Sequence, residues 1–148
     1  MSKVTFDTSI FIAYKPAKFP AGFVLSAVVI QELTAGAVDK SDLQRLNAVR
    51  RAYEKENRLL VPTGEDWWLA GKVLNSLLRG LKSKARGLAP RMPKGEQHRI
   101  IRDVLIATTA RRAGALVVTD NVRDFEKIKR FCNLRLKSGA DFFNLGEI

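Results

Sequence analysis

Four acidic residues, each in a different part of the chain, have the side-chain chemistry to hold a cation together. Asp7 follows an apolar run and Asp124 lies just past another, whereas Glu32 and Asp103 fall in segments expected to be helical. The carboxyl ends of neighbouring parallel strands meet in one crevice, where carboxylates repel each other unless a cation or a proton neutralises them. Oxygen ligands suit hard ions such as Mg²⁺ or Mn²⁺. In a basic chain, this pattern indicates metal-assisted cleavage of a polyanion.

Length and composition indicate a single domain spanning residues 1–148. The 148 residues are 46% hydrophobic, and no apolar run approaches the roughly 20 residues that a membrane helix needs. The N-terminal sequence lacks a secretory signal pattern. The single Cys132 cannot form an internal disulfide. We therefore expect a cytoplasmic protein with no membrane partner and a packed, non-catalytic cysteine.

The positive charge is concentrated in one segment. The formal net charge is +11, and the segment from Arg79 to Arg102 holds eight basic residues but one acid, Glu96. Such a field attracts phosphates and speeds encounter with nucleic acid, so RNA is the expected partner. A solvated surface or an acidic protein partner is the alternative. Lys94, Arg99 and Arg102 are the candidates for phosphate contacts.

Short apolar runs alternate with segments of helical spacing. The runs predict strands at 3–6, 23–25, 59–61, 115–118 and 134–136. The spacing predicts helices at 10–14, 27–36, 41–57, from 63 or 64, at 97–113 and at 121–131, and leaves 80–96 as a loop. Thr8 or Ser9 is expected to cap the first helix, and Ser26 the second. The alternation predicts an α/β protein with a parallel sheet and helices on both faces.

Each acidic residue taken alone is compatible with a purely structural role. Asp7 could cap a helix, Glu32 could be partly exposed, and Asp103 could pair with Arg99 one turn earlier. Asp120 and Asn121 resemble a turn. The joint arrangement of the four carboxylates favours a functional site over these separate explanations.

The chain resembles the PIN domain and, within it, the VapC-type ribonuclease toxins. The matching segments cover nearly the whole sequence. They are Phe6-Asp7-Thr8-Ser9, Leu25-Ser26-Ala27-Val28 with Gln31-Glu32-Leu33 and Gly36, Arg102-Asp103 with Ile106-Ala107-Thr108-Thr109-Ala110, and Thr119-Asp120-Asn121-Val122-Arg123-Asp124-Phe125. The resemblance implies a three-layer α/β/α sandwich around a short, roughly five-stranded parallel sheet.

The resemblance also implies a role for each matching residue. Asp7, Glu32, Asp103 and Asp124 would be the catalytic carboxylates that bind Mg²⁺ or Mn²⁺. The neighbouring residues Thr8, Ser9, Thr119 and Asn121 would organise the site. Asp120 is an extra acid at a variable position and a further candidate ligand, directly or through water. Arg102 departs from the family, since many members carry a polar residue before this Asp, and it is expected to alter substrate contacts.

By this resemblance the chain is a metal-dependent endoribonuclease, the toxin of a toxin–antitoxin pair. Its partners would be an RNA substrate, a small antitoxin and a second copy of itself in a homodimer. The alternatives are a housekeeping RNA-processing nuclease and a non-catalytic RNA-binding PIN module. Of Trp67 and Trp68, at least one is expected in the core and the other in a protein interface or stacked on a base. The lone His98 is not expected to take part in catalysis.

Overall fold

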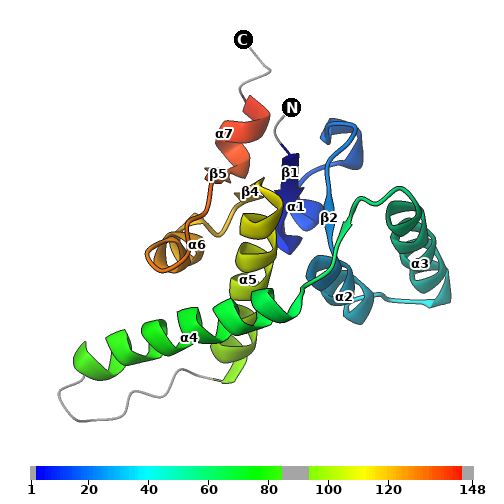
Figure 1. Cartoon of the computed structure of the whole chain (residues 1–148). Helices are drawn as coiled ribbons and strands as arrows, with labels where there is room; N and C mark the ends of the chain where they lie inside the picture. The colour runs from blue at the N-terminus through cyan, green and yellow to red at the C-terminus, as the bar shows by residue number, and fades with distance from the viewer. Residues whose placement is uncertain (1–2, 85–93, 145–148) are drawn as a thin grey trace.

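The computed structural model describes residues 3–84 and 94–144, although the side chains of 81–84 and 94 lie outside this description (Figure 1). The strands are β1 (Lys3–Phe6), β2 (Leu25–Ser26), β3 (Leu59–Leu60), β4 (Ala115–Thr119) and β5 (Leu136–Ser138). The helices are α1 (Thr8–Ala13), the 3-10 helix η1 (Pro16–Lys18), α2 (Ala27–Ala35), α3 (Lys40–Lys55), α4 (Gly64–Lys84), α5 (Lys94–Ala113), α6 (Val122–Lys129) and α7 (Gly139–Asn144). None of the described helices is long and apolar enough to cross a membrane.

All of these strands pair in parallel, as the alternating pattern predicts, but they form two sheets. One sheet has the order β1-β4-β5 and the other pairs β2 with β3. The two sheets are joined where the Val24 amide donates to the Val4 carbonyl at 2.9 Å and Thr5 Oγ1 donates to the Val24 carbonyl at 2.7 Å. The parallel α/β class is thus confirmed, with the strands divided three and two.

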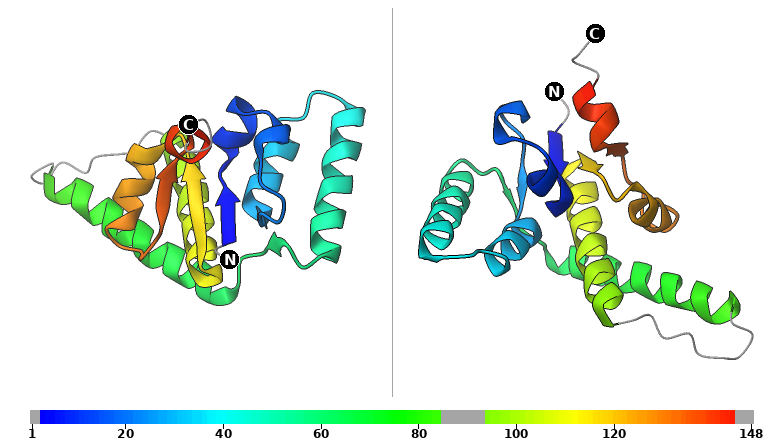
Figure 2. Two further views of the ribbon diagram at one scale, coloured as in Figure 1. Left: turned by 90° about the horizontal axis from the view of Figure 1, so that it is seen from above. Right: turned by 180° about the vertical axis from the view of Figure 1, so that it is seen from behind.

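The alternation of side chains along β4 shows that the sheet is covered on both faces. Ala115 and Val117 belong to one core cluster, and Leu116 and Val118 contact another. The first cluster includes buried residues of four helices: Val28 and Val29 of α2, Ala70 and Val73 of α4, Val104 to Ala107 of α5, and Phe125 and Ile128 of α6. The second receives side chains from α1 and α7. Helices therefore enclose the strands on both sides, as a three-layer sandwich requires (Figure 2).

The second core is built around the ring of Phe6, which is fully buried. Its ring centroid lies 4.8 Å from that of Phe19, 5.2 Å from that of Phe23 and 5.5 Å from that of Phe142. Aromatic pairs at such separations stabilise a core beyond the area they bury. This packing explains why residues 139–144, which have no clear pattern in the sequence, form the helix α7 on the sheet.

The basic segment is more helical than the sequence predicts. The predicted loop at 80–96 is wrong at both of its ends, because α4 continues to Lys84 and α5 already begins at Lys94. Charged residues on an exposed helix surface remove the apolar periodicity without breaking the helix. The side chains of Lys82, Lys84, Arg86, Arg91 and Lys94 lie outside the described part of the chain.

The prediction that one of the two tryptophans is buried is also wrong. The exposed fractions of Trp67 and Trp68 are 59% and 72%. The buried side of this helix instead carries Asp66, Ala70 and Val73. The sequence pattern misleads here because the first inward position of α4 is occupied by a carboxylate.

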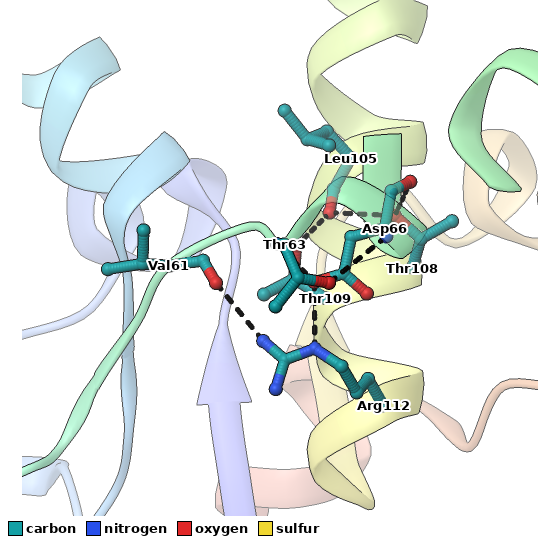
Figure 3. A network of polar contacts seen from close by, with 7 residues as sticks. All are labelled: Val61, Thr63, Asp66, Leu105, Thr108, Thr109 and Arg112. Carbon is teal, nitrogen blue, oxygen red and sulfur yellow. Dashed lines mark hydrogen bonds and ion pairs between the residues drawn. The ribbon is translucent and has the colours of Figure 1, made fainter. Parts of the chain in front are cut away.

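The Asp66 carboxylate fastens the start of α4 to α5 through a polar network (Figure 3). Asp66 Oδ2 accepts from the Thr63 amide at 2.9 Å, while the Asp66 amide donates to Thr63 Oγ1 at 3.2 Å, which is a reciprocal cap of the helix start. Arg112 Nε of α5 donates to the same carboxylate oxygen at 2.8 Å. Arg112 also donates to the Val61 carbonyl at 3.1 Å. One buried carboxylate thus holds the β3–α4 connection against α5.

We expect Asp66→Ala to lower the free energy of unfolding by about 2 kcal/mol, because it removes the buried carboxylate of a partly exposed ion pair together with a helix cap. Glu54→Ala is the matched control. It breaks the exposed pair in which Arg50 lies 2.7 Å from Glu54, and such pairs contribute less than about 0.5 kcal/mol. Urea denaturation followed by circular dichroism measures both variants. Equal losses in the two variants would contradict this role for Asp66.

Candidate active site

The candidate site is built at the carboxyl edge of the three-stranded sheet, where β1 and β4 end beside each other. Phe6 is opposite Val118 in the parallel register, and the Asp7 amide donates to the Val118 carbonyl at 3.1 Å. Asp7 and Thr119 therefore leave adjacent strands at the same level. Glu32 reaches this edge from α2, Asp103 from α5, and Asp124 from the first turn of α6.

Asp7 is buried and both of its carboxylate oxygens accept hydroxyl hydrogen bonds. Ser9 Oγ donates to Oδ1 at 2.6 Å and Thr119 Oγ1 donates to Oδ2 at 2.7 Å. Burial raises the pKa of Asp7, while the two hydroxyls and the Ile10 amide oppose that rise. The predicted cap at Thr8 or Ser9 is wrong, because Asp7 occupies the N-cap position of α1 and the Ser9 hydroxyl is directed to its carboxylate.

Each of these hydroxyls is fixed in turn by the loop after β4. The Asp120 amide donates to Ser9 Oγ at 3.1 Å, and the Asn121 amide donates to Thr119 Oγ1 at 2.9 Å. A hydroxyl that accepts from an amide has its own hydrogen free to point at a second acceptor. The backbone of residues 120 and 121 therefore sets the orientation of both donors to Asp7.

The pKa of Asp103 shows that the four predicted carboxylates share one electrostatic environment. Burial raises this pKa to about 7, with further contributions from the charges of Asp7, Glu32 and Asp124. Arg99 acts in the opposite direction. Three carboxylates from segments far apart in sequence thus raise the pKa of Asp103 by charge repulsion. The sequence pattern predicts such repulsion in a clustered acidic site.

Three buried oxygens beside this cluster have no hydrogen-bond partner within the described residues. These oxygens are Glu32 Oε1, Asp103 Oδ2 and Thr8 Oγ1. Arg102 Nε lies 3.9 Å from Glu32 Oε1, close enough for electrostatic attraction but too far for a hydrogen bond. Buried carboxylate oxygens are costly to leave unsatisfied, so the site offers acceptors for a further charged group.

These oxygens fit a hard divalent cation by their chemistry, although not as a finished coordination shell. In the part of the chain that the structure describes, no three Asp, Glu, His or Cys side chains are arranged as ligands of one ion. The mutual repulsion at Asp103 and the unsatisfied oxygens carry more weight here, because a divalent cation would neutralise the first and bind the second. Asp7 and Asp103 are the candidate central ligands, with Glu32 and Asp124 beside them.

The remaining predicted residues lie in different places. Asp120 is exposed, and its Oδ1 accepts from the Tyr14 hydroxyl at 3.3 Å. It is not among the charges that raise the pKa of Asp103, so its role as a ligand stays a prediction. Asn121 is the N-cap of α6, and its carbonyl accepts from the Asp124 amide at 3.1 Å. Asn121 thereby organises Asp124 through its backbone.

Two residues that the sequence analysis does not single out support this loop. A Cβ atom on Gly139 would lie 2.5 Å from Asp120 Oδ1 and 2.8 Å from the Tyr14 hydroxyl. Glycine at the start of α7 therefore leaves room for the contact between Tyr14 and Asp120, which a side chain at this position would displace. No local sequence pattern reveals it, since the three residues are distant in the chain.

Comparison with known proteins identifies the fold. No model of a known protein family matches the sequence, and no curated protein matches it. Among solved structures, the DNA-bound VapBC complex of Salmonella typhimurium is similar, with 24% identity, a TM-score of 0.57, and coverage of 93% of this chain and 98% of that chain. VapBC-1 from nontypeable Haemophilus influenzae is similar at 22% identity, with a TM-score of 0.55 and coverage of 91% and 96%. FitAB bound to the IR36 DNA fragment shares 14% identity, with a TM-score of 0.58 and coverage of 92% and 94%. The chain therefore shares the fold of these VapBC and FitAB structures, which fits the predicted PIN-like architecture.

Proposed function

We propose that the chain is a metal-dependent endoribonuclease and the toxin of a toxin–antitoxin pair. The observation that carries this proposal is the buried Asp103 carboxyl, which shares its environment with three other carboxylates at the sheet edge where the fold collects functional residues. The similarity to VapBC and FitAB structures supports the same conclusion. Clustered acids in a chain of net charge +11 suit a polyanionic substrate better than a neutral one.

The residues of the chain divide the work of phosphodiester hydrolysis. Mg²⁺ or Mn²⁺ would neutralise phosphate charge, activate water and stabilise the departing oxygen. Asp7 is held in one orientation by Ser9 and Thr119, so it presents a fixed carboxylate to the ion. Asp103 adds a buried second carboxylate, while Glu32 and Asp124 complete the acidic wall. Arg99 and Arg102 lie beside these acids and are suited to contact the phosphates that flank the cut.

The proposed partners follow from the same similarity. Four of the solved structures that resemble this chain are VapBC and FitAB structures, three of them with DNA. A small antitoxin encoded next to this protein would cover the acidic site, and a basic side chain of that antitoxin would pair with the carboxylates. We also propose that the protein forms a homodimer and acts in the cytoplasm.

We expect the purified protein to cleave RNA with Mg²⁺ or Mn²⁺ and to lose cleavage after EDTA treatment, with Ca²⁺ a poor substitute. Asp124→Asn should lower the rate at least about 100-fold, since even residues that only orient metal ligands contribute about 10- to 100-fold. Glu126→Gln, an exposed change on the same helix, is the control. Gel analysis of labelled total RNA measures both. Full cleavage after exhaustive dialysis against EDTA would refute the metal mechanism.

The raised pKa of Asp103 predicts how stability depends on pH in the metal-free protein. The folded state keeps a proton on Asp103 up to about pH 7, whereas the unfolded state loses it near 3.8. The folded state therefore binds more protons in this window, and stability falls as pH rises through it. Asp103→Asn should abolish cleavage yet raise the free energy of unfolding at about pH 8 by roughly 2–4 kcal/mol, and the gain should vanish near pH 4.

Urea unfolding in EDTA at several pH values tests this expectation. The same pH dependence in the wild type and in Asp103→Asn would show that Asp103 does not carry the repulsion.

Expression in cells separates a toxin from a housekeeping nuclease. We expect the chain alone to arrest growth, and co-expression of the neighbouring small gene product to relieve the arrest. Asp103→Asn should be harmless at the same protein level, as measured by immunoblot. A wild-type chain that cleaves RNA in vitro but leaves growth unchanged would favour the housekeeping nuclease.

A further inference from the structure

A pocket of about 380 Å³ opens between α4, α5 and α6, on the side of the site where Asp124 lies. Its lining residues include Leu77 of α4, Arg99 and Ile100 of α5, and Asp124, Lys127 and Phe131 of α6 and its end. In Figure 1, α4 crosses α5, and α6 lies beside α5. We call this hollow the α6 pocket. It has no assigned role in the mechanism above.

The α6 pocket adjoins the candidate active site, with which it shares Asp124. Asp124 lines the pocket and is also one of the acids that act on Asp103. Arg99 lines it as well and acts on the same carboxyl. A polymer held at the catalytic carboxylates therefore has one neighbouring unit within reach of the pocket.

One wall of the pocket is cationic. Arg99, Lys127 and Arg130 line it, and all three side chains are exposed. Within the described residues, the side chains of Lys127 and Arg130 make no hydrogen bond or ion pair, although the backbone of both belongs to α6 and its C-cap. The pocket also contains Glu96 and Asp124, yet neither carboxylate lies within 4.0 Å of these two cations among the described contacts. The charges of Lys127 and Arg130 are therefore available for an anionic ligand, such as a phosphate.

The other part of the pocket is aromatic and apolar. The ring of Phe131 is 45% exposed although the residues around it are anchored. Its amide donates to the Ile128 carbonyl at 2.9 Å, and its neighbours Ile128 and Cys132 are buried. Leu77 and Ile100 add apolar surface. An exposed aromatic ring on an anchored backbone, beside unpaired cations, is a combination on which proteins bind single-stranded nucleic acid, with a base on the ring and a phosphate on the charges.

We infer that the α6 pocket binds one nucleotide next to the cleaved phosphate, with its base against Phe131 and its phosphate on Lys127 and Arg130. The volume falls at the lower end of the range of about 300–1,000 Å³ for small-ligand pockets, which suits a single nucleotide. This inference rests on the proposed ribonuclease function and extends it to a base-contacting subsite. It predicts that the cut site is chosen partly by the base that enters this pocket.

Binding is measured without cleavage, by fluorescence anisotropy of a labelled hexaribonucleotide of mixed sequence in EDTA. Phe131→Leu removes the ring but keeps an apolar side chain, and we expect it to weaken binding about tenfold. It should leave binding of an abasic backbone of equal length unchanged. Lys127→Gln with Arg130→Gln should weaken binding of both probes and flatten the slope of log K against log salt by about 1.4. Lys129→Gln, on the same helix but outside the pocket, is the matched charge control.

Four outcomes would overturn the subsite. One is an equal loss with Lys129→Gln, which would indicate a diffuse positive field. A second is that Phe131→Leu weakens binding of the abasic probe as much as binding of the hexaribonucleotide. A third is that Phe131→Leu weakens binding of neither probe. The last is that Phe131→Leu binds RNA like the wild type but has a different molecular mass in solution by light scattering. That result would place the pocket in a protein interface.

The ribonuclease proposal fails separately from the subsite. Wild-type protein that binds the probe as expected but never cleaves RNA with Mg²⁺ or Mn²⁺ would refute the nuclease and leave an RNA-binding pocket. Wild-type protein that cleaves, with pocket variants that bind both probes normally, would refute the subsite alone. Mapping of cut ends adds a second readout, because Phe131→Leu should change the base preference at one position beside the cut.

Discussion

The burial of the Asp7 carboxylate is the constraint on which the site depends. A carboxylate at this position would lose much of its hydration, and two hydroxyls at 2.6 and 2.7 Å replace it. Those hydroxyls work only if β1 and β4 pair in the observed register and the loop after β4 directs its amides to Ser9 and Thr119. Pairing of the strands, the course of the loop and the chemistry of the site are thus parts of one requirement.

The same edge carries a repulsion that folding must overcome. Asp103 lies in the most buried stretch of α5, among residues that pack the core, and its ionised form is opposed by burial and by three other acids. Polar contacts elsewhere in the fold offset part of the free-energy cost of this repulsion. Asp66 and Arg112 hold α4 to α5 away from the acidic edge, so the helix that carries Asp103 is anchored independently of the site. The fold thus holds the Asp103 carboxyl among other acids through contacts that catalysis does not use.

The sequence was sufficient to predict the parts of the fold that depend on local chemistry. The strand before Asp7, the Ser26 cap of α2 and the parallel α/β class are confirmed. Features that depend on distant partners were not predictable. Nothing local indicates that the strands divide into two sheets, that α7 packs on Phe6, or that Gly139 lies close to Asp120 and Tyr14. The exposure of Trp67 and Trp68 also escaped the pattern, because a buried Asp66 holds the inward position.

The hydrogen bond between Thr119 and Asp7 spans 112 residues, and this separation matters during synthesis on the ribosome. The chain emerges from its N-terminus at about 5–20 residues per second, so Asp7 leaves the ribosome many seconds before Thr119. Throughout that interval the first carboxylate has no β4 beside it, no Thr119 hydroxyl and no loop to orient Ser9. A nascent chain is therefore an incomplete site, and the acidic cluster forms only when β4 and the loop after it are free to fold. The order of translation thus delays assembly of the carboxylates until β4 and the loop after it have left the ribosome.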